Sequence, residues 1–147
     1  GHGDTMVAML NHTKVDGEPI QKLLDNGKLS KLDLDKLVER TQKGGAEIVK
    51  YLEKGSAFYA PASAGVEMAE SYLKDLKKEL PCAAYLSGEY NVKGIYAGVP
   101  VVIGKNGVEK VVEIKLSSIE KEQFDKSIKA VQELFNAAIK IDKNLEK

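Results

Sequence analysis

The first half of the chain carries apolar residues at the spacing of an amphipathic helix. The pattern predicts a helix from Asp33 to Leu52, with Ser30 or Asp33 as its N-cap. Gly44-Gly45 interrupts this pattern, at a cost of about 1 kcal/mol for each glycine relative to alanine. A glycine pair inside a helix indicates a kink or a close neighbouring backbone. Of the two, we expect close packing.

Two further helices are predicted in the second half of the chain. One begins near Pro61, because proline suits the first turn of a helix, and its apolar positions continue to Leu76. The other runs from Ile119 to Asp142, and its start is indicated by Ser117 and Glu120, which form a capping-box pattern. Such a helix would be about 36 Å long and needs a sheet or a partner to cover its apolar stripe. We expect the lysine-rich tail after it to fray.

Strands are predicted between these helices. Alternating and β-branched residues give strands at Cys82–Tyr90, Gly98–Ile103 and Val108–Ile114, and the Asn-Gly pair before the last strand indicates a hairpin. Pro100 inside a strand argues for an edge or a bulge. Nearer the N-terminus, a turn is expected at Asp16-Gly17, followed by an extended segment over Glu18-Pro19-Ile20. The fold class is therefore α+β, an antiparallel sheet with long packed helices.

Composition limits the classes of function. The chain has 147 residues, 43% hydrophobic and 30% charged, which fits one soluble domain. Lysine plus arginine and aspartate plus glutamate are both 22, so the basic surplus of a nucleic-acid binder is absent. One cysteine, Cys82, excludes an internal disulfide. With no membrane-spanning apolar run and no signal pattern, we expect a cytoplasmic or organelle-matrix domain.

Few residues suggest chemistry on their own. His2 lies between two glycines, so a substrate could approach its ring closely, although a terminal residue is also expected to be disordered. His12 is expected at the surface and Cys82 as a buried structural thiol. A metal site built from His2, His12 and Asp4 matches no known ligand spacing, so no metal is expected. Neither a phosphate loop nor a Gly-x-Gly-x-x-Gly fingerprint occurs.

The opening heptapeptide Gly1-His2-Gly3-Asp4-Thr5-Met6-Val7 resembles the active-site histidine motif of the malate and lactate dehydrogenase family. The resemblance continues in the same order along nearly the whole chain, and its later blocks are those of the lactate-dehydrogenase-like malate dehydrogenases. These blocks are Glu39-Arg40-Thr41, Gly44–Val49, Gly55–Pro61, Ala83–Gly88, Gly98–Gly104 and Gly107–Lys110. Each block is moderately specific, and their shared order makes the resemblance strong.

This resemblance implies the C-terminal substrate-binding and catalytic domain, residues 1–147, of an NAD-dependent malate dehydrogenase. His2 matches the proton acceptor, which takes the hydroxyl proton of malate while the hydride passes to NAD. Ala57 falls at the wall beside the substrate. Pro61 falls near the nicotinamide ring, and Met6 follows His2 closely enough to line the same pocket, so the resemblance implies that both are cofactor-binding residues. The family also implies a dicarboxylic 2-hydroxy or 2-keto acid as ligand, a homo-oligomer, and a place in the tricarboxylic acid cycle.

Several parts of the family pattern would precede Gly1 and are absent from this chain. These are the NAD-binding Rossmann domain, the substrate-clamping arginines on a mobile loop, and the aspartate and arginine before the histidine. Gln42 stands where many relatives carry an arginine, and Arg40 alone cannot hold a dicarboxylate at both ends. We therefore expect this chain to be an inactive half, with the missing Rossmann half as partner and main NAD site.

Two alternatives stay open. The substrate could be lactate, because the discriminating residue belongs to the missing loop; Ala57–Pro61 favours malate by resemblance. The domain could instead be a non-enzymatic module that associates through its long helices. Turnover with NADH and oxaloacetate, and the association state in solution, discriminate between these readings.

Overall fold

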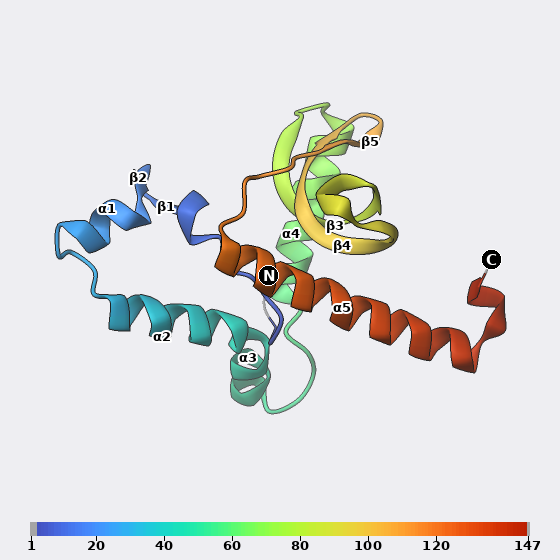
Figure 1. Ribbon diagram of the computed structural model, residues 1–147, viewed down its shortest axis with the longest axis horizontal. Helices are drawn as coiled ribbons and strands as arrows, with labels where there is room; N and C mark the ends of the chain where they lie inside the picture. Colours follow the sequence, from blue (N-terminus) through green and yellow to red (C-terminus); the bar gives the residue numbers. More distant parts are fainter. Residues whose placement is uncertain (1–2, 147) are drawn as a thin grey trace. The chain divides into compact units, whose positions relative to one another are not determined.

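The computed structural model describes residues 3–146. It divides into two compact units (Figure 1). The first comprises the residues up to Ser56 together with Ser117–Phe124, and the second comprises Ala57–Leu116 and the residues from Asp125 onward. Each unit is described by itself below. Among the described residues, no helix combines the length and apolarity that crossing a membrane requires.

The first unit begins with short elements. A 3-10 turn, η1 (Leu10–His12), leads into the hairpin of β1 (Lys14–Val15) and β2 (Glu18–Pro19) and then α1 (Ile20–Asp25). Asp16 and Gly17 form the hairpin turn with φ of 51° and 82°, which confirms the predicted turn. The extended prediction was right for Glu18-Pro19 and wrong for Ile20, because the chain turns into α1 directly after the proline.

The predicted helix of the first half is in fact two helices, α2 (Lys31–Gln42) and α3 (Gly44–Leu52). Ser30 is the N-cap, since its hydroxyl oxygen accepts a hydrogen bond from the Asp33 amide at 3.1 Å. The prediction of close packing at the glycine pair was wrong at Gly44, where an added Cβ would meet nothing within 4 Å. The glycines mark a helix break, because they make helix continuation costly.

The second unit is built on a three-stranded antiparallel sheet in the order β3-β4-β5 (Figure 1). The strands are β3 (Lys78–Ser87), β4 (Lys93–Gly104) and β5 (Gly107–Val111), and α4 (Tyr59–Leu73) packs against β4. This confirms the antiparallel neighbours and the hairpin before β5, and it places Pro61 in the first turn of α4 as predicted. Relative to the prediction, β3 and β4 begin earlier and β5 ends earlier.

Alternation along β4 builds the core of this unit. One face of the sheet is buried, and its residues are Ala84, Leu86, Ile95, Ala97, Val99, Val101 and Ile103. The prediction of an edge or a bulge at Pro100 was wrong, because β4 is the central strand and both shifts in register lie elsewhere. Pro100 instead pairs with Pro81, so the two residues that lack an amide donor share one register position.

The last helix, α5 (Ser118–Ile141), confirms the predicted long element to within a residue at each end. The capping box is formed: the Ser117 amide donates to Glu120 Oε2 at 2.8 Å, and the Glu120 amide donates to Ser117 Oγ at 3.3 Å. After α5, residues Lys143–Glu146 form a 3-10 turn, η3, and the fraying of this tail stays a prediction. The Asn144 amide donates to Asp142 Oδ1 at 2.9 Å and so starts this turn.

Candidate functional site

The loop that follows the predicted catalytic residue is anchored on the end of α2. His2 itself lies outside the described residues, and the loop is described from Gly3. The Gly3 amide donates to the Gln42 carbonyl at 2.7 Å, and Gln42 Nε2 donates to the Met6 carbonyl at 3.1 Å. The Met6 amide donates back to the Gly3 carbonyl at 3.0 Å, which closes a turn. Gln42 therefore binds both ends of the turn.

Arg40 is committed to an ion pair across the helix break. Its Nη2 lies 2.8 Å from Glu47 Oε1 and its Nε lies 3.0 Å from Glu47 Oε2, so the contact is bidentate. The hydrogen bond from Arg40 lowers the pKa of the Glu47 carboxyl, and the one to Glu47 raises the pKa of Arg40. The single arginine of the chain thus spans α2 and α3. This pairing agrees with the expectation that Arg40 cannot clamp a dicarboxylate by itself.

A second set of contacts joins the start of α5 to η1. Asn11 Nδ2 donates to Glu120 Oε2 at 3.2 Å, the same oxygen that accepts from the Ser117 amide. Glu120 is 5% exposed, and its Oε1 is buried without a hydrogen-bond partner among the residues described. Burial alone would raise the pKa of Glu120, but the hydrogen bonds from Ser117 and Asn11 outweigh it and hold the pKa below its usual value.

The two predicted site residues of the second unit lie together at the start of α4. Ala57 is half-buried just before the helix, and Pro61 is exposed in its first turn. The neighbouring side chains are small and exposed, including Ala60 and Ala62, and an added Cβ at Gly65 would meet nothing within 4 Å. Met6 belongs to the first unit.

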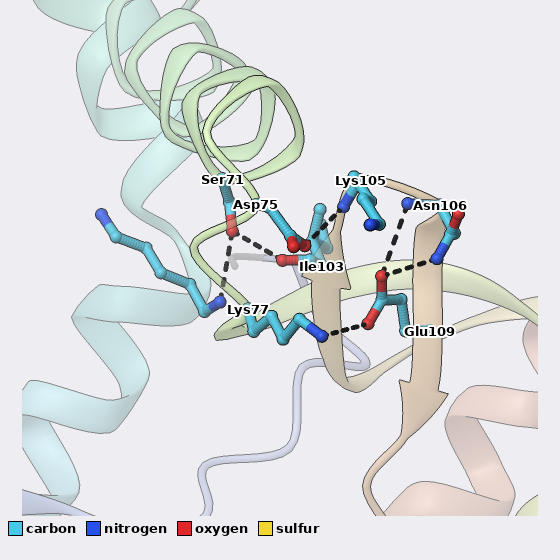
Figure 2. Close-up of polar contacts among 8 residues, drawn as sticks. Ser71, Asp75, Lys77, Ile103, Lys105, Asn106 and Glu109 are labelled. Atoms are coloured by element: carbon cyan, nitrogen blue, oxygen red, sulfur yellow. Dashed lines mark hydrogen bonds and ion pairs between the residues drawn. The ribbon is translucent and has the colours of Figure 1, made fainter.

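Hydrogen bonds hold the end of β4 and the turn that follows it against the C-terminal end of α4 (Figure 2). The buried Ser71 hydroxyl donates to the Ile103 carbonyl at 2.7 Å and accepts from the Lys78 amide at 3.2 Å. On the same side, the Lys105 amide donates to Asp75 Oδ1 at 3.0 Å. This geometry confirms that the glycines around Lys105 do not form a phosphate loop, because the turn leads into a strand and its amide is already paired with a carboxylate.

The structure also tests the environments predicted for Cys82 and His12. Cys82 is half-buried rather than buried, its Sγ lies 3.2 Å from the Met68 sulfur, and burial raises the pKa of its thiol. This favours a structural role, because the thiolate is the reactive form. His12 is exposed, as predicted. Within residues 3–146, no group of three or more histidine, cysteine, aspartate or glutamate side chains could hold a metal ion.

Among the residues that the structure describes, each unit carries a shallow hollow. The hollow in the first unit has a volume of about 460 Å³ and lies over the helix break beside Arg40, Glu47 and their lysine neighbours. The one in the second unit has a volume of about 410 Å³ and lies on the sheet face that carries the edge-to-face ring pair Tyr85 and Tyr96. Neither is lined by Met6, Ala57 or Pro61.

The antiparallel sheet with its packed helix and the anchored loop define an α+β domain. Over residues 1–141 the chain matches the model of the lactate/malate dehydrogenase, alpha/beta C-terminal domain. The chain therefore belongs to the lactate/malate dehydrogenase family, as its C-terminal domain. It is 60% identical over 147 residues to a malate dehydrogenase of Pelagibacter ubique (strain HTCC1062). The aligned region covers 100% of this chain and 46% of that protein.

Solved structures agree with this assignment. The lactate dehydrogenase from Eimeria maxima with NADH and oxamate matches with a TM-score of 0.91 and 39% identity over 97% of this chain and 44% of that chain. Cryptosporidium parvum malate dehydrogenase matches with a TM-score of 0.88 and 46% identity over 91% of this chain and 43% of that chain. The chain spans less than half the length of these relatives. The predicted family and fold class are confirmed.

Sequence reasoning missed the contacts of two residues. Gln42 was noted only for the arginine that it replaces, and its two hydrogen bonds to the Gly3–Met6 turn were not anticipated. A signal was present, because Gln42 is the last helical residue before a glycine pair and the last carbonyls of a helix need outside donors. Glu120 was predicted as a capping residue, and its bond to Asn11, 109 positions away in sequence, had no signal in the pattern.

Proposed function

We propose that this chain is the substrate-binding half of an NAD-dependent malate dehydrogenase that interconverts malate and oxaloacetate. The observation that carries the proposal is the match over the whole chain, at 60% identity, to a malate dehydrogenase. The identities to the two malate dehydrogenases, 60% and 46%, exceed the 39% to the Eimeria maxima lactate dehydrogenase, which supports malate over lactate.

His2 is the proposed proton acceptor. In the oxidation its imidazole takes the proton of the substrate hydroxyl, and in the reduction it returns that proton to the carbonyl oxygen. Bound NAD would supply the acceptor for the hydride on the substrate carbon that carries this hydroxyl. An imidazole suits both directions because its pKa lies near neutrality. This chain thus supplies the group that takes and returns the proton. In total, the oxidation removes one hydroxyl proton and one hydride from malate.

The remaining predicted residues shape the site. Ala57 and Pro61 are proposed to form a small apolar wall at the start of α4, Ala57 beside the substrate and Pro61 beside the nicotinamide. Met6, on the loop that follows His2, is proposed as a cofactor-binding residue of the first unit. Because the chain covers 46% of the Pelagibacter ubique malate dehydrogenase, we propose that the pyrophosphate and adenosine of NAD are held by an N-terminal nucleotide-binding domain.

Exposed apolar side chains support a partnered protein. On α3 and the segment after it, Ile48, Tyr51, Leu52 and Phe58 are all exposed. Large apolar surface seldom stays free on a soluble protein. We propose that such faces are covered by the nucleotide-binding domain or by further copies of the subunit, in a cytoplasmic homo-oligomer acting in the tricarboxylic acid cycle. An isolated chain of residues 1–147 is then expected to show no turnover.

The test is a steady-state assay of the full-length protein at the nicotinamide absorbance, with malate and lactate compared as substrates. We expect a preference for malate, and H2Q should lower kcat/KM about 1,000-fold because a general base contributes on this scale. H12Q makes the same change at the other histidine, which is exposed, and should leave kcat/KM within about two-fold. Equal activity of H2Q and H12Q would remove His2 from the mechanism.

Two other outcomes identify the alternatives. A higher kcat/KM for lactate than for malate would assign the lactate branch of the family. No nicotinamide-dependent turnover with either acid, together with a stable homo-oligomer in sedimentation, would favour the interaction module.

A further inference from the structure

The end of α2 presents an unusual acceptor to the N-terminal loop. The last four carbonyls of an α-helix have no partner within the helix, and the Gln42 carbonyl is the last of α2. Lys43, with φ of −87° and ψ of 2°, separates it from α3. The Gly3 amide fills this position with the 2.7 Å hydrogen bond. The helix break thus creates the anchoring point for the loop.

The side chain of the same residue supplies a second anchor. Gln42 is half-buried, and its Nε2 donates to the Met6 carbonyl at 3.1 Å. Because the Met6 amide also donates to the Gly3 carbonyl at 3.0 Å, the turn between the two anchors is closed on itself. Two attachments from one residue restrict rotation of the turn as well as its position. A single hydrogen bond would leave the turn free to pivot.

We propose that Gln42 is the positioning residue for His2. The nitrogen of Gly3 belongs to the peptide group that joins Gly3 to His2, so the atom that Gln42 holds is the first one beyond that residue. Gly3 itself has φ of 115°, a conformation that favours glycine, so the first residue of the anchored turn tolerates little change. This inference rests on the proposed function of His2 as proton acceptor.

The chemistry of the side chain matters for this role. The Met6 carbonyl is an acceptor and needs an N–H donor opposite it. Glutamine supplies this donor, whereas glutamate of the same shape would place an oxygen against the carbonyl oxygen. Methionine of similar length would supply neither charge nor donor. Lysine would restore an N–H donor at nearly the same reach. Together, the three substitutions separate the effect of losing the N–H donor from the effects of changing the side chain's shape and charge.

The experiment compares Q42E, Q42M and Q42K in the full-length protein. Q42E and Q42M should lower kcat about 10- to 100-fold, with KM for NAD within about two-fold, since a misplaced proton acceptor slows the chemical step rather than coenzyme binding. Q42K should recover kcat to within about three-fold of the parent. Q132E adds the same charge at an exposed position of α5 and should behave as the parent does. Hydrogen exchange should show faster exchange of the Gly3 and Met6 amides in Q42M than in Q42K.

The inference is overturned if Q42M and Q42E keep the parent kcat. It is also overturned if Q42K loses as much activity as Q42M, because the N–H donor would then not be the cause. Should Q42E fail to fold, Q42M and Q42K decide the question, since neither adds a negative charge. Failure of the proposed function is recognised separately, by full activity of H2Q. In that case unchanged exchange of the Gly3 and Met6 amides in Q42M would reject the anchoring as well.

Discussion

The two units of the molecule are stabilised in different ways. Of the ten apolar side chains that are buried among the described residues, the second unit holds seven, on one face of its sheet, whereas the first holds Ile20, Leu34 and Phe124. With few buried apolar side chains, the first unit has distant segments that are joined by single polar contacts. Examples are the bonds of Gln42 to the Gly3–Met6 turn and the bond of Asn11 to Glu120.

This difference bears on where the proposed chemistry takes place. The proposed proton acceptor precedes the first unit's anchored turn, while the more extensively buried sheet carries none of the predicted site residues. Parts of a protein with few buried apolar contacts open at lower free energy than its core, and moving elements are drawn from them. We infer that the sheet provides stability to the domain and that the polar anchors provide precision to the loop.

The largest expected effect comes from the sheet core. Leu86 is 0% exposed, so L86A should lower the free energy of unfolding by about 3 kcal/mol through lost burial and the cavity that is left. L134A, at an exposed position of α5, makes the same change and should cost less than about 0.5 kcal/mol. Urea unfolding of both variants measures the difference.

Hydrogen exchange on L86A tests the comparison itself. The amides of β3 and β4 should exchange faster, and those of α2 should keep their parental rates if the units open separately. An equal acceleration in α2 would show that the two units unfold as one, and the contrast between them would then be one of composition only.

Much of the second unit could be predicted from sequence, for a physical reason. Its strands are specified by local alternation, and the turn before β5 by an Asn-Gly pair, so short-range patterns were enough. Pro100 was misjudged because its tolerance depends on Pro81, a partner 19 positions earlier that only the register brings opposite. The split between α2 and α3 was visible as a glycine pair, but composition could not distinguish a break from close packing.

The site was predictable only in part. His2, Met6, Ala57 and Pro61 were assigned by resemblance to a family, and periodicity alone would have left His2 as a terminal residue. The hydrogen bonds of Gln42 depend on a loop 36 positions away, and those of Glu120 on one 109 positions away. Such long-range polar contacts leave no periodic signal, because they arise only once the helices have packed.

A smaller effect is expected from the buried hydroxyl of Ser71, which makes two hydrogen bonds in the second unit. S71A removes the hydroxyl that pairs the Ile103 carbonyl and the Lys78 amide, so it should lower the free energy of unfolding by about 2 kcal/mol. S63A, an exposed position on the same helix, should change it by less than about 0.5 kcal/mol. Thermal or urea unfolding measures both. Equal stability of S71A and S63A would mean that burial alone holds α4 to the sheet.

The smallest effect is expected at Glu120, and it depends on pH. The folded pKa of Glu120 lies below its ordinary value, so its stabilising contribution is complete above the unfolded pKa of about 4.3 and is lost as the pH falls through the folded pKa. E120Q keeps an acceptor oxygen but loses the charge, and it should cost about 1 kcal/mol at pH 7. At a pH below the folded pKa of Glu120, where the carboxyl is protonated in both states, the variant and the parent should be equally stable.

The control for this prediction lies on the same helix. E133Q changes an exposed carboxylate and should shift stability by less than about 0.5 kcal/mol at any pH, because exposed ion pairs contribute little. Free energies of unfolding measured in urea from pH 3 to pH 7 give both curves. If E120Q keeps the full acid sensitivity of the parent, the carboxylate of Glu120 does not stabilise the first unit. The contacts of Gln42 with the Gly3–Met6 turn would stand unchanged by that outcome, because they share no group with Glu120.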